Sequence, residues 1–294
     1  MLSRDLRRKL SRIGAIPPPA DGAAPQVRPP RPSRPAPWDI PEDSSPVFFP
    51  VADEGDEFVD LLGGGEIDAD FGPFWLTELE VEGVWPRARA LLDDLATRPG
   101  AAPDIPEMQG LEPSDLLVFD IETAGLMGAT LFLAGVLDFL SGAPRLRFFL
   151  ARDYDEEPAM LDALAAHMAR TRAIVTFNGK SFDVPFLADR MRYHRLRFDP
   201  PPVHIDILHA ARRRWRGRFE NCRLQTLERE LCGRHRTDDV PSEWIPAVYH
   251  EFVATQDAEL LVPILQHNAL DLLTLWELLC ATLATPVPNR AENR

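Results

Sequence analysis

The spacing of apolar and polar residues is most regular in the second half of the chain, where it predicts a mixed α/β architecture. Short apolar runs at residues 116–121, 130–140 and 145–151 are bounded by turn residues, as is typical of buried strands. A Ser-Gly-Ala-Pro turn joins the last two runs, so we expect the three strands to form an antiparallel meander. Helical spacing follows at residues 156–171, and a further apolar run at residues 173–177 predicts another strand.

The remaining periodic segments predict helices. Residues 181–194 keep a helical pattern in spite of Pro185, which the first turn of a helix tolerates. Residues 205–215 and 224–232 predict shorter helices, and a long apolar stripe predicts a final helix over about residues 258–283. We therefore expect an α/β fold in which helices flank a sheet of antiparallel and parallel strands.

Composition divides the chain into regions. Residues 1–46 are rich in Pro, Ala and Arg, and we expect a disordered arm there because such a segment buries too little apolar surface. Leucines spaced along residues 2–13 leave a short amphipathic helix open as an alternative, with a basic face for nucleic acid or an anionic surface. Residues 47–110 predict a small β-hairpin region with a linker, residues 111–285 the α/β domain, and residues 286–294 a tail.

The overall composition limits the classes of protein to which the chain can belong. A hydrophobic share of 45% supports a sizeable core, and the formal net charge of −14 argues against non-specific coating of nucleic acid. None of the three cysteines forms a CxxC pair, so we expect reduced thiols in a cytoplasmic protein. The N-terminal residues lack the apolar segment of a signal peptide, and no apolar run is long enough to span a bilayer, which argues against a membrane partner.

Four acidic residues lie where predicted apolar elements meet a turn or continue as a helix, namely Asp120, Glu122, Asp183 and Asp271. Asp120 and Glu122 are two positions apart on a strand, so their side chains share one face of the sheet. Carboxylates that converge repel one another and raise each other's pKa values. Mg²⁺ or Mn²⁺ removes that repulsion, because hard cations prefer carboxylate oxygens. Two such ions would support hydrolysis of a phosphodiester bond by activating water and stabilising the leaving oxygen.

Three further residues are candidates for the same site. His267 lies four positions before Asp271, so both side chains share one helix face, and a neutral imidazole can take a proton from water. The alternative is a histidine of the helix surface or core. Asn178 and Lys180 lie in a turn before Asp183, where they would contact a sugar, a water molecule or a phosphate. Ordinary Asn-Gly turn chemistry is the alternative for Asn178.

A basic segment with an interleaved aromatic residue predicts contacts with nucleic acid. Arg212 and Arg213 would hold phosphates, and Trp215 would stack on a base. The alternative is a solvated charged face. Thr123, directly after the Asp-x-Glu pair, completes the predicted contacts, whereas Asp206 is expected to have a structural role.

Three motifs carry a resemblance to a known family. The segments FDIETAGL, FNGKSFDVPFL and HNALD, in this order, resemble the motifs of the DEDD exonuclease superfamily. The segments GGGEIDADFGPFWLTELEVEGV and CRLQTLERELCGRHRTDDVPSEWIPAVYHEF are similar to the YprB-type ribonuclease-H-like family, and the resemblance covers about residues 59–283. It implies a ribonuclease-H-like mixed sheet, a 3′–5′ exonuclease activity on DNA or RNA, and two divalent metal ions held by the four acids.

The position of the histidine departs from the pattern of that superfamily. Its histidine subgroup places His five residues before the last Asp, whereas His267 has the four-residue spacing that the tyrosine subgroup uses. His267 is therefore either the general base or the group that orients the attacking water. Two other functions stay open: a structure-specific endonuclease on the same fold, and a catalytically silent module that binds nucleic acid.

Overall fold

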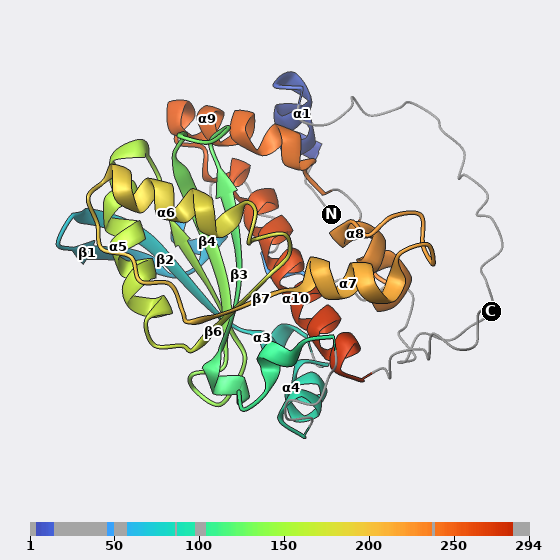
Figure 1. The fold of residues 1–294 in the computed structure, drawn as a ribbon. Coiled ribbons are helices and arrows are strands. Elements are labelled where there is room, and N and C mark those ends of the chain that lie inside the picture. The colour runs from blue at the N-terminus through green and yellow to red at the C-terminus, as the bar shows by residue number, and fades with distance from the viewer. Residues whose placement is uncertain are drawn as a thin grey trace, which may run out of the picture.

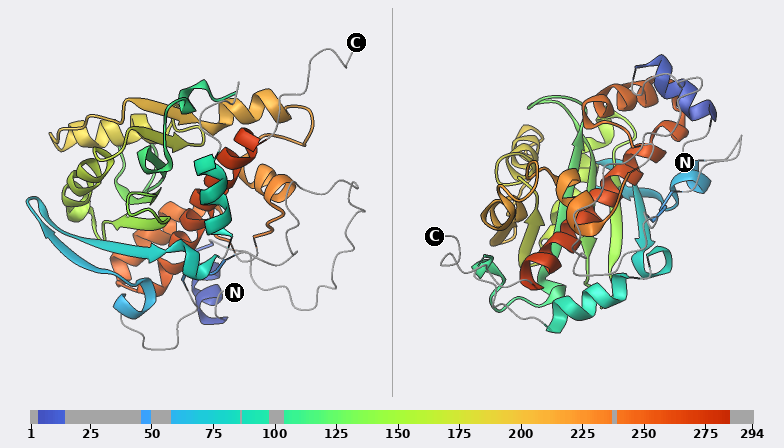
Figure 2. Two further views of the ribbon diagram at one scale, coloured as in Figure 1. Left: turned by 90° about the horizontal axis from the view of Figure 1, so that it is seen from below. Right: turned by 90° about the vertical axis from the view of Figure 1, so that its right-hand side faces the viewer.

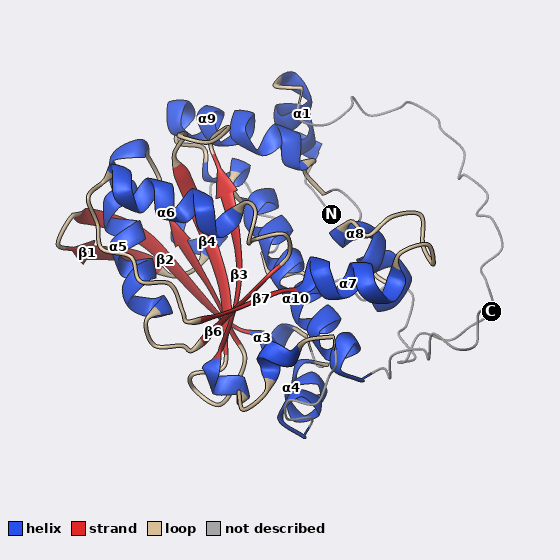
Figure 3. Cartoon of the chain, in the orientation of Figure 1, coloured by secondary structure: helices blue, strands red, loops and turns tan. Residues whose placement is uncertain are grey.

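The computed structural model describes most of the chain, in the ranges 4–14, 46–49, 58–85, 87–97, 104–236 and 239–284. Strands from both halves of the chain form one seven-stranded sheet in the order β1-β2-β5-β4-β3-β6-β7 (Figure 1, Figure 3). The strands are β1 (Gly65–Ala69), β2 (Gly72–Glu80), β3 (Leu116–Thr123), β4 (Leu131–Asp138), β5 (Arg145–Leu150), β6 (Ala173–Thr176) and β7 (Val203–Asp206).

Helices cover both faces of this sheet, as the two views in Figure 2 show. The α-helices are α1 (Arg4–Arg12), α2 (Phe58–Leu62), α3 (Val81–Val84), α4 (Ala88–Thr97), α5 (Glu157–Met168), α6 (Asp183–Tyr193), α7 (Ile207–Trp215), α8 (Leu224–Leu227), α9 (Ile245–Thr255) and α10 (Val262–Ala284). The shorter turns are η1 (Pro106–Met108), η2 (Pro113–Asp115), η3 (Tyr154–Glu156), η4 (Glu228–Cys232), η5 (Ser242–Trp244) and η6 (Ala258–Leu260).

The central strands confirm the predicted mixed sheet. β3, β4 and β5 form an antiparallel meander in which Asp120 of β3 lies opposite Gly135 of β4. β6 pairs parallel with β3, and β7 pairs parallel with β6. The sequence did not predict β7, because its four residues alternate apolar and polar side chains over too short a stretch to be distinguished from the helix that follows.

The predicted hairpin lies at the other edge of the same sheet. β1 and β2 pair antiparallel, and β2 continues the sheet by pairing antiparallel with β5 from Trp75 to Glu80. The hairpin therefore extends the central sheet instead of forming a separate layer. The domain boundaries proposed from the sequence stay a prediction.

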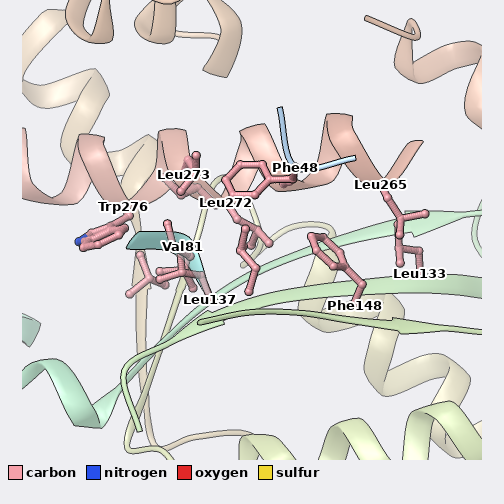
Figure 4. Packing of buried hydrophobic residues seen from close by; sticks show 14 of the residues in the cluster. Phe48, Val81, Leu133, Leu137, Phe148, Leu265, Leu272, Leu273 and Trp276 are labelled. Carbon is pink, nitrogen blue, oxygen red and sulfur yellow. The ribbon is translucent and has the colours of Figure 1, made fainter. Parts of the chain in front are cut away.

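Alternation along β3 divides the apolar residues between two cores. Leu117 and Phe119 belong to the core on the face that α5 and α6 cover. Leu116 and Val118 belong to the core on the opposite face, where α10 crosses the sheet (Figure 2). Figure 4 shows side chains of α10 packed against residues of β4 and β5 in this second core. Burial of these faces fixes which side of the sheet each residue of β3 points to.

The expectation of a disordered N-terminal arm requires a correction at its beginning. Residues 4–12 form α1, with Leu6 and Leu10 buried in the core on the α10 face. Lys9 makes ion pairs with Asp257 at 2.7 Å and Glu259 at 2.8 Å. Burial of the leucine stripe and these ion pairs stabilise a helix that is too short to be stable alone in water. Residues 1–3 and 15–45 of the predicted arm lie outside the described residues.

Two other expectations concern the cysteines and membrane-spanning helices. Cys222, Cys232 and Cys280 are all free thiols, as the sequence led us to expect. Within the described ranges, none of the helices has the length and apolar character that crossing a membrane requires.

A buried carboxylate links the end of β4 to α5. Asp138, the last residue of β4, is fully buried, and its Oδ2 lies 2.9 Å from Nε2 of His167. Arg147 of β5 also pairs with this carboxylate, and the backbone N–H of Leu140 donates to Oδ1 at 3.1 Å. Burial raises the pKa of Asp138, but the hydrogen bond from His167 and the charge of Arg147 outweigh it, so the pKa is lower than usual.

We expect Asp138→Asn to destabilise the fold by about 3 kcal/mol at pH 7, because His167 and Arg147 lose their buried partner. A lowered folded-state pKa contributes stability above the unfolded-state pKa of about 4, and this contribution is lost as the pH falls through the folded-state value. The difference between the wild type and the variant should therefore shrink as the pH falls below about 4. Urea denaturation across this range measures it.

Asp189→Asn is the control, because Asp189 forms an exposed pair with Arg192 on α6. We expect it to change the free energy of unfolding by less than about 0.5 kcal/mol. Equal stability of Asp138→Asn and the wild type at pH 7 would contradict the proposed role of the buried pair.

Candidate active site

The Asp-x-Glu pair faces α10. Asp120 and Glu122 have the same parity along β3 as Leu116 and Val118, which lie in the core on the α10 face. Nδ2 of Asn268, on α10, donates a hydrogen bond of 2.8 Å to Oδ2 of Asp120. The expectation that both acids share one face of the sheet agrees with this geometry.

A glycine in the neighbouring strand allows α10 to approach the sheet. Gly135 lies opposite Asp120, and a Cβ at Gly135 would lie only 1.7 Å from Oδ1 of Asn268. Glycine inside a strand often marks such a close approach. The missing side chain therefore leaves the space in which Asn268 reaches Asp120.

Asp183 enters the site from the first residue of α6. The turn before it is left-handed at Asn178, with φ of 65°, a conformation that Asn tolerates better than most residues. Oδ1 of Asp206 accepts the N–H of Asn178 at 2.9 Å, and Oδ2 accepts the N–H of Lys180 at 3.2 Å. Asp206 also caps α7 by accepting the N–H of Leu208. It has the structural role expected from the sequence, and it fixes the turn that positions Asp183.

One cleft of about 260 Å³ brings these elements together. All four acids and His267 line it, together with Thr123 and Asn178. The rest of the wall consists of Ile121, Phe177, Phe182, Ser242, Ile245 and Pro246. Side chains from β3, the β6–α6 turn, α6, α9 and α10 thus meet although they lie far apart in the sequence.

The four acids of the cleft would place several negative charges close together in a buried site, which is unfavourable. Removal from water raises the pKa of Asp120 well above its usual value, and the charges of Asp271, Glu122 and Asp183 raise it further. Burial raises the pKa of Glu122 to about 7, although the positive charge of His267 opposes this shift. Burial likewise raises the pKa of Asp183 to about 7. The cluster would be stabilised by positive charge inside the cleft.

The donor set fits a hard divalent cation. Its ligands would all be carboxylate oxygens, which is the chemistry that Mg²⁺ and Mn²⁺ prefer. Among the residues that the structure describes, no three His, Cys, Asp or Glu side chains form a preassembled metal-binding group. The four acids therefore supply suitable charge and chemistry, and their side chains would adjust to complete the coordination of an ion.

His267 is held between two carboxylates. Its Nδ1 lies 2.7 Å from Oδ1 of Asp239, and its Nε2 lies 3.5 Å from Oδ2 of Asp271. Burial lowers the pKa of His267, but the charges of Asp271 and Asp239 outweigh it and raise the pKa to about 9. Arg236 donates a hydrogen bond from Nη2 to Oδ1 of Asp271. Both oxygens of Asp271 therefore face a positively charged group.

Sequence reasoning missed three residues of this arrangement, namely Asn268, Arg236 and Asp239. Asn268 lies three positions before Asp271 on one helix, and this spacing was a usable signal that it faces the same cleft. The sequence analysis assigned no role to Asp239 or Arg236. Their positions in a loop between η4 and α9 gave no periodic pattern from which a direction could be inferred.

The predicted contacts with nucleic acid divide into two groups. Thr123 and Asn178 line the cleft, and the hydroxyl of Thr123 donates to the carbonyl of Gly125 at 2.8 Å. The side chains of Lys180 and Arg212 are exposed outside the cleft.

Two residues of α7 behave differently from the prediction. Trp215 is only 4% exposed and packs in the core, so the prediction that it stacks on a base is wrong. It falls on the same apolar stripe of α7 as Ile207 and Ala211, and burial of that stripe holds it inside. Arg213 is exposed, but its guanidinium donates to the carbonyl of Asp104.

Comparison with known proteins identifies the class. A profile of the RNase_H superfamily matches residues 117–282, and the chain therefore belongs to this superfamily. A relative that is 33% identical over 175 residues is the "Uncharacterized protein YprB" of Bacillus subtilis (strain 168). The match covers 58% of this chain and 42% of the relative, so the chain spans less than half of the length of that relative. The family and the ribonuclease-H-like fold expected from the sequence are confirmed.

We expect Gly135→Ala to destabilise the protein by about 1–3 kcal/mol, because the new Cβ would overlap with Asn268 at the centre of a packed interface. Combining it with Asn268→Ala should recover part of the loss, because the overlapping amide is then absent. A double-mutant cycle on the free energy of unfolding measures the coupling.

Gly83→Ala serves as the control, because a Cβ at Gly83 meets no atom within 4 Å. No loss of stability in Gly135→Ala, or strictly additive effects in the cycle, would show that α10 does not depend on this close approach.

Proposed function

We propose that the chain is a metal-dependent 3′–5′ exonuclease that hydrolyses phosphodiester bonds of DNA or RNA. The observation that carries this proposal is the convergence of four carboxylates and an imidazole from three separate elements in one cleft. Membership of the RNase_H superfamily supports the nuclease class. The order of the three sequence motifs supports the exonuclease type.

The proposal gives each residue of the cleft a role. Asp120, Glu122, Asp183 and Asp271 would hold two Mg²⁺ or Mn²⁺ ions through their oxygens, and Asn268 would fix the orientation of Asp120. When bound, such ions lower the pKa of a water ligand and stabilise charge on the leaving oxygen. His267 is the proposed partner of the attacking water. As an imidazolium, the form that its raised pKa favours before ions bind, it orients the water, and only as a neutral imidazole would it be the base.

The size of the cleft favours an end of a strand over the middle of a duplex. A cavity of about 260 Å³ is of the order that suits a small-molecule ligand, and here that ligand would be the terminal nucleotide. Thr123 and Asn178 in the wall would contact this nucleotide. Lys180 and Arg212 outside the cleft would hold phosphates of the adjoining strand, which gives an acidic protein a local basic surface.

We expect Asp120→Asn to reduce Mg²⁺- or Mn²⁺-dependent hydrolysis by more than about a hundredfold, because several kcal/mol of transition-state stabilisation depend on the bound ions. The variant should be at least as stable as the wild type in EDTA, because one of the mutually repelling carboxylates has lost its charge. Product lengths from 3′- and 5′-labelled linear strands, together with thermal unfolding in EDTA, measure both effects.

Two controls accompany this assay. Asp60→Asn changes an exposed acid of α2 and should leave the activity unchanged. A circular single strand should resist the wild-type protein, because an exonuclease requires a free end. Activity that survives EDTA or Asp120→Asn would overturn the proposal, and cutting of the circle would favour the endonuclease instead.

Binding of a single strand should depend on Lys180 and Arg212. In an Asp120→Asn background, each of the changes Lys180→Gln and Arg212→Gln is expected to reduce the slope of log K against log salt by about 0.7, because each removes one phosphate contact. Fluorescence anisotropy with a labelled oligonucleotide at several salt concentrations measures the slope. The matched control is Arg89→Gln on α4, which also removes an exposed arginine. Unchanged slopes for Lys180→Gln and Arg212→Gln would remove these residues from the binding surface.

A further inference from the structure

A buried arginine outside the cleft wall connects Asp271 and His267, the two candidate site residues of α10. Arg236 lies in the loop that follows η4, and its side chain is only 6% exposed. It donates from Nη2 to Oδ1 of Asp271 and from Nε to Oε2 of Glu228 at 2.7 Å. Its Nη1 lies 3.4 Å from Oδ2 of Asp239. One guanidinium thus contacts three carboxylates that come from three parts of the chain.

These contacts divide the two oxygens of Asp271 between different partners. Oδ1 is engaged by Arg236, whereas Oδ2 lies 3.5 Å from Nε2 of His267. A carboxylate held through one oxygen keeps a fixed orientation, and a cation bound at the other oxygen would replace the charge contact with His267. Hydrogen-bonded partners of this kind commonly orient metal-ligating carboxylates.

The same guanidinium also reaches His267 through a second carboxylate. Oδ2 of Asp239 lies beside Arg236, and Oδ1 of Asp239 lies 2.7 Å from Nδ1 of His267. The imidazole ring can therefore turn only if Asp239 moves as well. A planar fork with several donors suits this arrangement, because a lysine ammonium would be a single point of contact.

We propose that Arg236 is a positioning residue that orients Asp271 for cation binding and, through Asp239, orients His267. This inference rests on the proposed function, because it requires Asp271 to hold an ion. It assigns a task to Arg236 and Asp239, which do not line the cleft themselves.

A neighbouring arginine provides a matched comparison. Arg234 is also buried, with 4% of its side chain exposed, and it bonds Glu228 at 3.0 Å and Glu277 at 2.7 Å. It donates to Oγ1 of Thr274 as well. None of these partners lines the cleft, so a change at Arg234 tests the stability of the same loop without touching Asp271.

The test is the affinity for Mn²⁺ in the absence of substrate, measured by calorimetry and by the electron paramagnetic resonance of free Mn²⁺. Arg236→Gln is expected to lower the affinity for the Mn²⁺ ion that depends on Asp271 by about 10–100-fold. Arg236→Lys should fall between this variant and the wild type, because charge without the planar fork restores only part of the orientation. Arg234→Gln should lower the melting temperature and leave the affinity within about twofold of the wild type.

Asp271→Asn separates the two proposals. If the wild type binds no Mn²⁺, or if Asp271→Asn binds as well as the wild type, the metal site of the proposed function fails. If Asp271→Asn weakens binding but Arg236→Gln and Arg236→Lys do not, the proposed function stands and the role of Arg236 is refuted.

If Arg236→Gln does not fold, a comparison of Arg236→Lys with Arg234→Lys provides the test instead. Arg236→Lys is expected to weaken Mn²⁺ binding, and Arg234→Lys is expected to leave it unchanged at a similar melting temperature. Equal affinities in these two variants would show that Arg236 acts only on stability.

Discussion

Four carboxylates lie in one cleft between β3, α6 and α10, and their mutual repulsion is the constraint on which the rest of the site depends. Burial and neighbouring charge raise the pKa values of Asp120, Glu122 and Asp183. A protein retains such an arrangement at a cost in stability, and a positive charge inside the cleft relieves it. The amide of Asn268 bonds Asp120, and the positive charges of His267 and Arg236 lie against Asp271.

The scaffold fixes these groups through regular elements more than through loops. The alternation of β3 sends two acids toward α10, and the apolar side chains of α10 pack on the sheet beneath (Figure 4). Gly135 allows the helix close enough for Asn268 to reach Asp120. Packing of the core and orientation of the acids are therefore coupled, because α10 contributes side chains to both.

Loops contribute the contacts that cross between these elements. The turn at Asn178 is held by Asp206 from β7, and this sets the start of α6 and the position of Asp183. The segment after η4 brings Arg236 and Asp239 against α10. Both loops are anchored by carboxylates bonded to backbone N–H groups or to buried side chains. The chain thus uses acids both as candidate ligands and as the supports that position them.

The sequence by itself determined the meander of β3–β5, the long final helix and the four acids, because periodicity and local motifs depend only on neighbouring residues. It also placed Asp120 and Glu122 on one face of a strand. Only the tertiary structure decided that the N-terminal leucines are buried in α1, that Trp215 lies in the core, and that Arg236 contacts Asp271. These outcomes depend on which surfaces meet across the fold. A stripe of leucines or a buried guanidinium acquires its partner only when segments that are distant in the sequence pack together.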